Sequence, residues 1–349
     1  MKKLSFNHSA HWLILTLANV FFLFTACQQN TQKQSSAPNT NNSLVATTDE
    51  QPQQQPDNEV DNDWKKLELK GKVKTLTKII YEGVEKNGKF VKDELSPEPF
   101  AITRTSFNPQ GFITLIEQFN NLQMVNPFST QKNRYNATGQ LLEVITSRSG
   151  DAPTKYTYSY NKQGDRTLER METASLSEPY DIEYHYQYTP EGKQQTVVKN
   201  TGIDKIKTIS YYDKNNLLVK EEQYDLQGAS IKKEVKTYNE NQKLIKSVII
   251  SNNQETTLAY SYDSYGNLTS IREKSPEGTA TQVYKYHYNN KGQILKEEFQ
   301  LTSTYDDIFD SSYVIIYTYD AQGNKLTEAQ SQPDAAPPIT ITEYRIEYY

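Results

Sequence analysis

Polar and apolar side chains alternate along most of the chain after residue 62, and this period of two is that of a β-strand with one buried face. The positions that share one face of the first such strand are Val73, Thr75, Thr77, Ile79 and Tyr81. Asn87-Gly88 then predicts a two-residue hairpin turn, with a return strand that begins at Phe90. Residues 95–101 contain two prolines and are expected to form a loop or a sheet edge. Helical periodicity is almost absent.

A short motif recurs between residues 107 and 326: an aromatic residue, Asp or Asn, two variable positions, Gly, one variable position, then Leu or Ile. Its copies begin at Phe107, Tyr135, Tyr160, Tyr188, Tyr212, Tyr238, Tyr262, Tyr288 and Tyr319, with a fainter copy at Tyr224. The Asp or Asn side chain starts a turn by bonding to the backbone two residues on. The Gly accepts a positive φ, and Asn216 and Gln242 stand in its place in two copies. The repeat therefore predicts an array of β-hairpins.

Tyrosines occupy alternate positions of the strands that lead into these turns. They include Tyr156, Tyr158 and Tyr160; Tyr184, Tyr186 and Tyr188; Tyr260 and Tyr262; and Tyr284, Tyr286 and Tyr288. The residues between them are mostly polar, so one face of the sheet carries the rings and the other faces water. Since tyrosine supplies 26 aromatic residues and only 35% of the chain is hydrophobic, the core is expected to be thin.

These patterns predict an all-β fold in which tandem antiparallel hairpins form one long, coiled sheet, either spiralling or a half-barrel. The last strand is expected over residues 339–346, after Pro333, Pro337 and Pro338, where it would pair with and blunt the final edge.

Residues 1–26 have the pattern of a signal peptide, with Lys2 and Lys3 before an apolar run that is too short for a comfortable membrane span. Phe24-Thr25-Ala26-Cys27 resembles a bacterial lipobox, which implies cleavage before Cys27 and a lipid on that cysteine. The alternative is an ordinary secretory signal with an incidental cysteine. Residues 27–62 are polar, lack aromatic residues and predict a disordered tether, which leaves residues 63–349 as the repeat domain.

The motif resembles the YD repeat of the Rhs and teneurin families, whose core is Tyr-x-Tyr-Asp-x-x-Gly-x-Leu. Residues 260–268 match it at every defined position, and residues 317–323 match it up to the Gly. The whole layout is similar to small YD-repeat lipoproteins of Bacteroidota-type bacteria. The resemblance implies hairpins strung into a spiralling sheet and a lipid-anchored place in the cell envelope, with the outer membrane expected. It assigns no activity. We do not expect so few units to enclose a cargo or a toxin-like domain to follow the repeats, so a role in toxin delivery is not expected.

Composition narrows the candidate chemistry. A net charge of −5 gives the chain no overall positive charge that would attract nucleic acid. The only cysteine is Cys27, so the repeat domain lacks a thiolate nucleophile and a cysteine-based zinc site. We expect no cofactor and no metal site. His185 and His287, the acidic group Asp306, Asp307 and Asp310, and the pairs Glu221-Glu222 and Glu297-Glu298 are interpreted as solvated side chains rather than as a metal site or catalytic carboxylates.

The tyrosine stripe is the remaining candidate site, and its expected ligand-binding residues are Tyr156, Tyr158, Tyr184, Tyr186, Tyr260, Tyr262, Tyr284 and Tyr286. The alternative, which the sequence favours, is that the stripe is plain core. We expect a non-enzymatic envelope lipoprotein that is attached to a membrane through its N-terminal lipid and binds a glycan or a protein partner. Two alternatives remain open: an immunity or scaffold protein for a toxin or an envelope assembly, and a carboxylate-based hydrolase that acts on polysaccharide.

Overall fold

The computed structural model describes residues 62–349, apart from residues 201–204, 226, 306–307, 309 and 333–338. The predicted signal peptide and nearly all of the tether lie outside the described residues. Within the described part, no helix is long and apolar enough to cross a membrane.

The described chain begins with one short helix, α2 (Asp63–Lys66), and then forms strands only. The first half of the strands comprises β1 (Val73–Lys86), β2 (Lys89–Lys92), β3 (Ala101–Phe107), β4 (Ile113–Phe119), β5 (Ser129–Tyr135), β6 (Leu141–Arg148), β7 (Thr154–Tyr160), β8 (Arg166–Thr173), β9 (Tyr180–Thr189) and β10 (Gly192–Asn200). The second half comprises β11 (Lys205–Asp213), β12 (Leu218–Tyr224), β13 (Ser230–Tyr238), β14 (Leu244–Ser251), β15 (Gln254–Tyr262), β16 (Leu268–Lys274), β17 (Thr279–Tyr288), β18 (Ile294–Ser303), β19 (Ser311–Tyr319), β20 (Lys325–Ser331) and β21 (Ile339–Tyr348).

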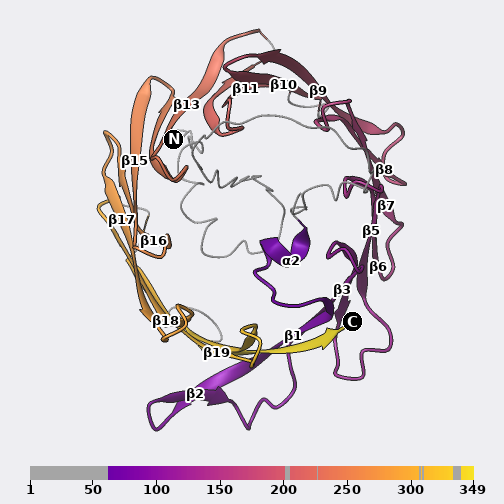
Figure 1. The fold of residues 1–349 in the computed structure, drawn as a ribbon, viewed down its shortest axis with the longest axis vertical. Coiled ribbons are helices and arrows are strands. Elements are labelled where there is room, and N and C mark those ends of the chain that lie inside the picture. Colours follow the sequence, from indigo (N-terminus) through magenta and orange to yellow (C-terminus); the bar gives the residue numbers. More distant parts are fainter. Residues whose placement is uncertain (1–61, 201–204, 226, 306–307, 309, 333–338) are drawn as a thin grey trace, which may run out of the picture. The chain divides into compact units, whose positions relative to one another are not determined.

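The strands close into a barrel (Figure 1). From β3 to β21 each strand pairs antiparallel with the next, and β1 pairs with both β3 and β21. The result is a barrel of 20 strands, with β2 paired only to the far end of β1. The expectation of an open, spiralling sheet or half-barrel is therefore wrong. The last strand does not blunt an edge, because it bonds to β20 on one side and to β1 on the other.

The turns of the repeated motif form as the sequence predicts. Asp263, for example, accepts the backbone N–H of Asn267 on Oδ1 at 2.8 Å, and Gly266 adopts a φ of 89°. Asn216 and Gln242 take positive φ values of 62° and 59° at the same place in their turns. The copy at Tyr188 differs, because Thr189 pairs directly with Gly192 in a tight hairpin. There a Cβ on Gly192 would stand 1.9 Å from the carbonyl oxygen of Tyr212, which explains the glycine.

A register shift follows each turn that an Asp or Asn caps. In the hairpin of β15 and β16, Tyr262 pairs with Leu268 and Ser261 with Ser270, so that Thr269 is an extra residue. The same irregularity occurs in the hairpins that begin with β3, β5, β7, β11, β12, β13, β17 and β19. Bulges of this kind bend a strand and increase its twist. Repeated around the sheet, they provide the curvature that closure requires.

The predicted first hairpin is confirmed. Lys86 pairs with Lys89 around Asn87 and Gly88, both of which have positive φ values. The residues after β2, up to Phe100, form the predicted loop.

Side chains of α2 identify the inner face of the barrel. The helix lies inside the ring (Figure 1), and Oδ2 of Asp63 accepts hydrogen bonds from the backbone of Ile113 at 2.7 Å and from the hydroxyl of Tyr135 at 3.3 Å. Tyr135 therefore faces inward. We call the face that carries Tyr135 and its register partners the inner wall, and the opposite face the outer wall.

The densest apolar cluster lies on the outer wall, at the seam where β1 joins β3 and β21. The registers place Ile79, Ile102 and Phe119 side by side there, and each is at most 2% exposed. Phe90 of β2 and Met124 pack over them. The most deeply buried core thus stabilises closure and does not coincide with the tyrosine stripe.

Candidate functional site: the inner wall

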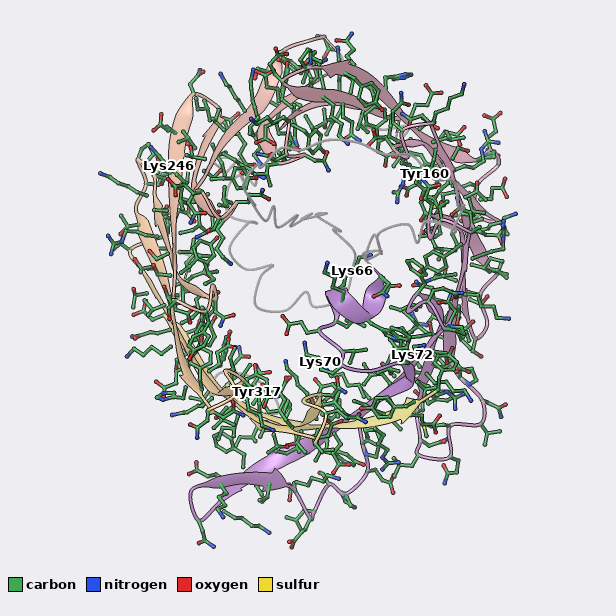
Figure 2. The ribbon with its side chains drawn as sticks, viewed as in Figure 1. Lys66, Lys70, Lys72, Tyr160, Lys246 and Tyr317 are labelled. Atoms are coloured by element: carbon green, nitrogen blue, oxygen red, sulfur yellow. The ribbon has the colours of Figure 1, made fainter. Side chains whose placement is uncertain are left out.

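All eight tyrosines predicted to bind a ligand lie on the inner wall. The registers relate them to Tyr135: Tyr156 pairs with Val144, which pairs with Asn133, and Asn133 donates to the Tyr135 hydroxyl. Figure 2 shows Tyr160 and Tyr317 on the inner side of the strands. The remaining members follow by alternation along β9, β15 and β17. The sequence prediction that the rings share one face is confirmed.

The outer wall carries the residues between the tyrosines. His185 and His287 lie there, with side chains 65% and 61% exposed. Exposed charged residues stand on the outer side of the strands around the barrel: Glu183, Lys207, Lys246, Arg272, Lys285, Arg345 and Glu347. The outer wall thus carries exposed charged side chains on strands all around the barrel, beside exposed apolar residues such as Val235 and Ile316.

Strand number sets the width of the interior. A closed sheet of 20 strands, spaced by about 4.8 Å and tilted by about 40°, is roughly 40 Å across between backbones. A tyrosine spans a small part of that width, so rings on opposite walls cannot pack against each other. The stripe is consequently half-buried along the wall instead of forming a filled core. Of the described residues, α2 and the segment leading to β1 lie within the ring, including Lys66 and Lys70 (Figure 2).

Many of the tyrosine hydroxyls are held by the backbone of the preceding hairpin. Tyr186 donates to the carbonyl of Arg166 at 2.8 Å, Tyr262 to that of Leu244 at 2.8 Å, and Tyr286 to that of Leu268 at 2.9 Å. The same bond recurs from Tyr160 to Leu141, from Tyr238 to Leu218 and from Tyr319 to Ile294. These bonds fix the tilt of each ring and join neighbouring hairpins.

The final tyrosine of some strands instead reaches the Asp or Asn turn of the hairpin before it. Tyr288 donates to Oδ2 of Asp263, the capping residue of its turn. Tyr188 instead accepts from the capping residue Asn161 at 2.7 Å and donates to Oδ2 of Asp165, which follows the Gly of that turn, at 2.7 Å. Asp263 thus has two structural tasks, since its Oδ1 caps its own turn and its Oδ2 accepts the hydroxyl of Tyr288.

The predicted tyrosines fall into two groups on the inner wall. Those on β7 and β9 flank β8, whose Glu169 accepts the Tyr184 hydroxyl at 3.3 Å. Those on β15 and β17 flank β16. Between the groups, β12 and β13 present Glu221, Glu234 and Lys232 to the interior.

Sequence reasoning missed part of the second group. Phe299 of β18 stacks on Tyr313 of β19 at 4.6 Å between ring centroids, and its ring is tilted by 51° against that of Tyr284 at 5.1 Å. Tyr317 and Tyr344 extend the same aromatic area on β19 and β21. The alternation of Tyr313, Tyr317 and Tyr319 was the available signal.

Burial keeps the inner tyrosines protonated. It raises the pKa of Tyr158 and of Tyr260 to about 12 each, with nearby Glu169 and Glu234 as secondary causes. Burial also raises the pKa of Tyr284, Tyr286, Tyr313 and Tyr317. The hydroxyls therefore remain donors throughout the physiological range.

The paired glutamates are divided between the two walls. Glu297 pairs with Tyr286 and faces inward, whereas Glu298 pairs with Lys285 and faces outward. Glu222 likewise lies on the outer wall, where it accepts from Tyr211 at 3.2 Å, and Glu221 lies inside. Adjacent acids on a strand cannot act together as catalytic carboxylates, because they point away from each other.

No group of three or more His, Cys, Asp and Glu side chains within the described ranges has a geometry that fits a metal ion. Asp306 and Asp307 lie outside the described residues, and Asp310 accepts the backbone N–H of Ser303 at 2.9 Å. That the protein uses no cofactor stays a prediction.

No protein-family model matches the chain, and no curated protein matches it. Among solved structures, a porin-like protein from Bacteroides uniformis shows 10% identity and a TM-score of 0.31, over 79% of this chain and 96% of that one. The TcdB2-TccC3-Cdc42 and TcdB2-TccC3 structures each show 13% identity and a TM-score of 0.24 over 69% of this chain. The chain spans only 19% and 20% of those two proteins. Likenesses this distant assign no family, and they carry no argument for function.

Proposed function

We propose that this protein is a non-enzymatic, lipid-anchored binding protein of the cell envelope whose inner wall holds a glycan. The observation that carries the proposal is the set of tyrosine rings on alternate positions of β7, β9, β15 and β17. All of these rings face an interior too wide to be filled from the walls.

The spacing of the rings suits an extended ligand. Along β17 the rings of Tyr284 and Tyr286 lie 6.5 Å apart and 7° from parallel, and along β9 those of Tyr186 and Tyr188 lie 6.0 Å apart. Aromatic faces stack on the C–H face of a sugar ring, and successive rings on one strand offer successive stacking positions. Because the hydroxyls are already bonded to the wall, the rings lose little conformational entropy on binding.

Charged residues on the outer wall favour an aqueous environment, rather than the bilayer, for the barrel. A transmembrane barrel presents an apolar band to the bilayer, and a Lys or Arg at its midplane costs about 2–4 kcal/mol. Lys207, Lys246 and Arg272 stand on the outer side of three strands of this barrel. In the proposal, Cys27 therefore supplies the membrane attachment, and the barrel stands off the surface.

The test is binding of the full-length protein to a glycan array, followed by calorimetry on the glycans retained. Tyr284→Ala combined with Tyr286→Ala should weaken binding roughly 30-fold, at about 1 kcal/mol for each ring. Tyr211→Ala is the matched control, because Tyr211 is a tyrosine of the outer wall. Tyr286→Phe keeps the ring and loses the bond to Leu268, so it should bind nearly as well as the wild type.

Equal weakening by the inner and outer tyrosine changes would refute the inner wall as the site. Shortening of the glycan by purified protein would establish the hydrolase alternative. Retention of a protein partner but of no glycan would favour the immunity or scaffold alternative.

A further inference from the structure

Glu297 is an inner-wall carboxylate that two tyrosine hydroxyls hold in place. Its Oε1 accepts the hydroxyl of Tyr313 at 2.8 Å, and its Oε2 accepts that of Tyr317 at 3.3 Å. Within the described part of the chain, no Lys, Arg or His nitrogen lies within 4.0 Å of it. The carboxylate is therefore held in place by neutral donors, without a counter-charge from the protein.

In two other hairpins, a glutamate at the same position of the motif has a basic side chain close to it. Glu169, Glu221, Glu297 and Glu328 each lie eight residues after the Asp or Asn of their motif turn, and Glu221, like Glu297, has an apolar residue, Leu218, three positions before it. Three residues before Glu169 is Arg166, whose Nη1 is 3.1 Å from the carboxylate. Three residues before Glu328 is Lys325, whose Nζ is 3.9 Å away. The corresponding residue for Glu297 is Ile294, which supplies no charge.

Aromatic rings surround the unbalanced carboxylate. Tyr286 is its direct cross-strand partner, and the rings of Tyr284 and Phe299 lie beside it, 5.1 Å apart between centroids and tilted by 51°. On the other side, Phe299 stacks on Tyr313 at 15° from parallel. Rings attract a cation through their negative faces, and they do so more strongly where water is displaced. In this molecule Lys325 already lies over the ring of Tyr317, 4.5 Å from its centroid.

We infer that Glu297, with Tyr284, Tyr286, Tyr313 and Tyr317, forms a binding site for an ammonium group, and that the glycan of the proposed function is one with free amino groups. This inference rests on the proposed function and names its ligand class. The carboxylate supplies the charge that Arg166 and Lys325 neutralise elsewhere, and the rings supply the walls of the site.

The experiment compares glucosamine oligomers with N-acetylglucosamine oligomers of equal length, by calorimetry on the full-length protein. The wild type should bind the glucosamine oligomer about tenfold more tightly. Glu297→Gln keeps an acceptor for the tyrosines and removes the charge, so this preference should disappear. Glu298→Gln is the matched control, since the neighbouring residue faces outward, and it should keep the preference.

A second variant leaves Glu297 in place. Ile294→Lys reproduces the arrangement of Lys325 and Glu328, and it should abolish the preference by balancing the charge internally. Thermal unfolding checks that each variant is folded. If Glu297→Gln does not fold, Ile294→Lys alone decides the question.

The two proposals fail in different ways. Equal binding of both oligomers by the wild type, unaffected by Glu297→Gln, would overturn the ammonium site and leave glycan binding standing. Tetramethylammonium alone, followed by tyrosine fluorescence, tests the site without a glycan. If tetramethylammonium binds only when Glu297 is present and neither oligomer binds, the ammonium site stands and the glycan proposal fails. Tetramethylammonium that binds wild type and Glu297→Gln equally would overturn the site.

Discussion

The hydroxyl of Tyr348 on the last strand donates a 3.1 Å hydrogen bond to Oδ2 of Asp320, in the turn between β19 and β20. The other oxygen of Asp320 accepts the backbone N–H groups of Gln322 and Asn324 at 2.9 and 2.8 Å. Asn324 in turn bonds to the backbone of Lys70, next to the first strand. Asp320 therefore caps a turn and also bonds to the last strand, while Asn324 of the same turn bonds to the segment before the first strand.

Asp320→Ala should lower the free energy of unfolding by about 2 kcal/mol, of which about 1 comes from the turn bonds and about 1 from the tyrosine bond. Asp213→Ala is the matched control. Asp213 caps its turn in the same way, but Tyr238, the last tyrosine of β13 and the counterpart of Tyr348, donates to the carbonyl of Leu218. Asp213→Ala should lower the free energy of unfolding by about 1 kcal/mol. Equal decreases in the free energy of unfolding, measured by urea titration, would show that the hydrogen bond from Tyr348 does not stabilise the protein.

Phe119→Ala should be among the most destabilising single changes in the barrel. Phe119 is 1% exposed in the apolar cluster at the seam, and truncating such a ring costs about 3–5 kcal/mol. Ile316→Ala removes a large apolar residue that is 38% exposed on the outer wall, and it should cost less than about 1 kcal/mol. A small effect of Phe119→Ala on the thermal midpoint would mean that the seam is not what stabilises closure.

Alkaline pH should unfold the protein. Burial raises the pKa of Tyr158 and Tyr260 to about 12 each, above the value of about 10 in an unfolded chain. The stability that these groups contribute is therefore complete below about pH 10, and it is lost as the pH rises through 12. Tyrosinate absorbance and far-UV circular dichroism, recorded in one titration, should change together above pH 10. Ionisation of the inner tyrosines near pH 10 with the β signal intact would contradict the burial.

Cys27→Ser should release the protein from the membrane fraction of its native host, because a serine cannot take the lipid that the lipobox resemblance implies. Fractionation followed by immunoblotting measures the change. Asn30→Ser, a substitution of similar size in the tether, should leave the attachment unchanged. Persistent membrane attachment of the cysteine variant would exclude lipidation as the anchor.

The turns were predictable from sequence because their chemistry is local. An Asp or Asn that caps the backbone two and four residues on, followed by a residue that tolerates positive φ, is contained within a few positions. Even Gln242, a poor substitute for Gly, takes the predicted conformation with a φ of 59°. At Tyr188 the predicted turn did not form, because Pro190 and Gly192 make a tighter hairpin in which Thr189 pairs directly with Gly192.

The role of the acids could not be predicted, because it depends on which wall each one faces. Glu297 and Glu298 look alike in the sequence. Only the register, in which Glu297 pairs with Tyr286 and Glu298 with Lys285, shows that the first faces inward and the second outward. The sequence spacing shows Arg166, Ile294 and Lys325 at equivalent positions, but only the structure shows that Arg166 and Lys325 reach their glutamates.

The strand pattern, the turns and the shared face of the tyrosines follow from the order of the residues, since each depends on neighbours within one hairpin. Closure of the sheet does not. It joins β1 to β21, where Thr75 and Glu347 bond across 272 positions of sequence, and it depends on the small bends that successive bulges add together. That closure turned the tyrosine face from the side of a sheet into the lining of a barrel. The candidate site therefore exists through long-range pairing, although every residue in it belongs to a locally predictable strand.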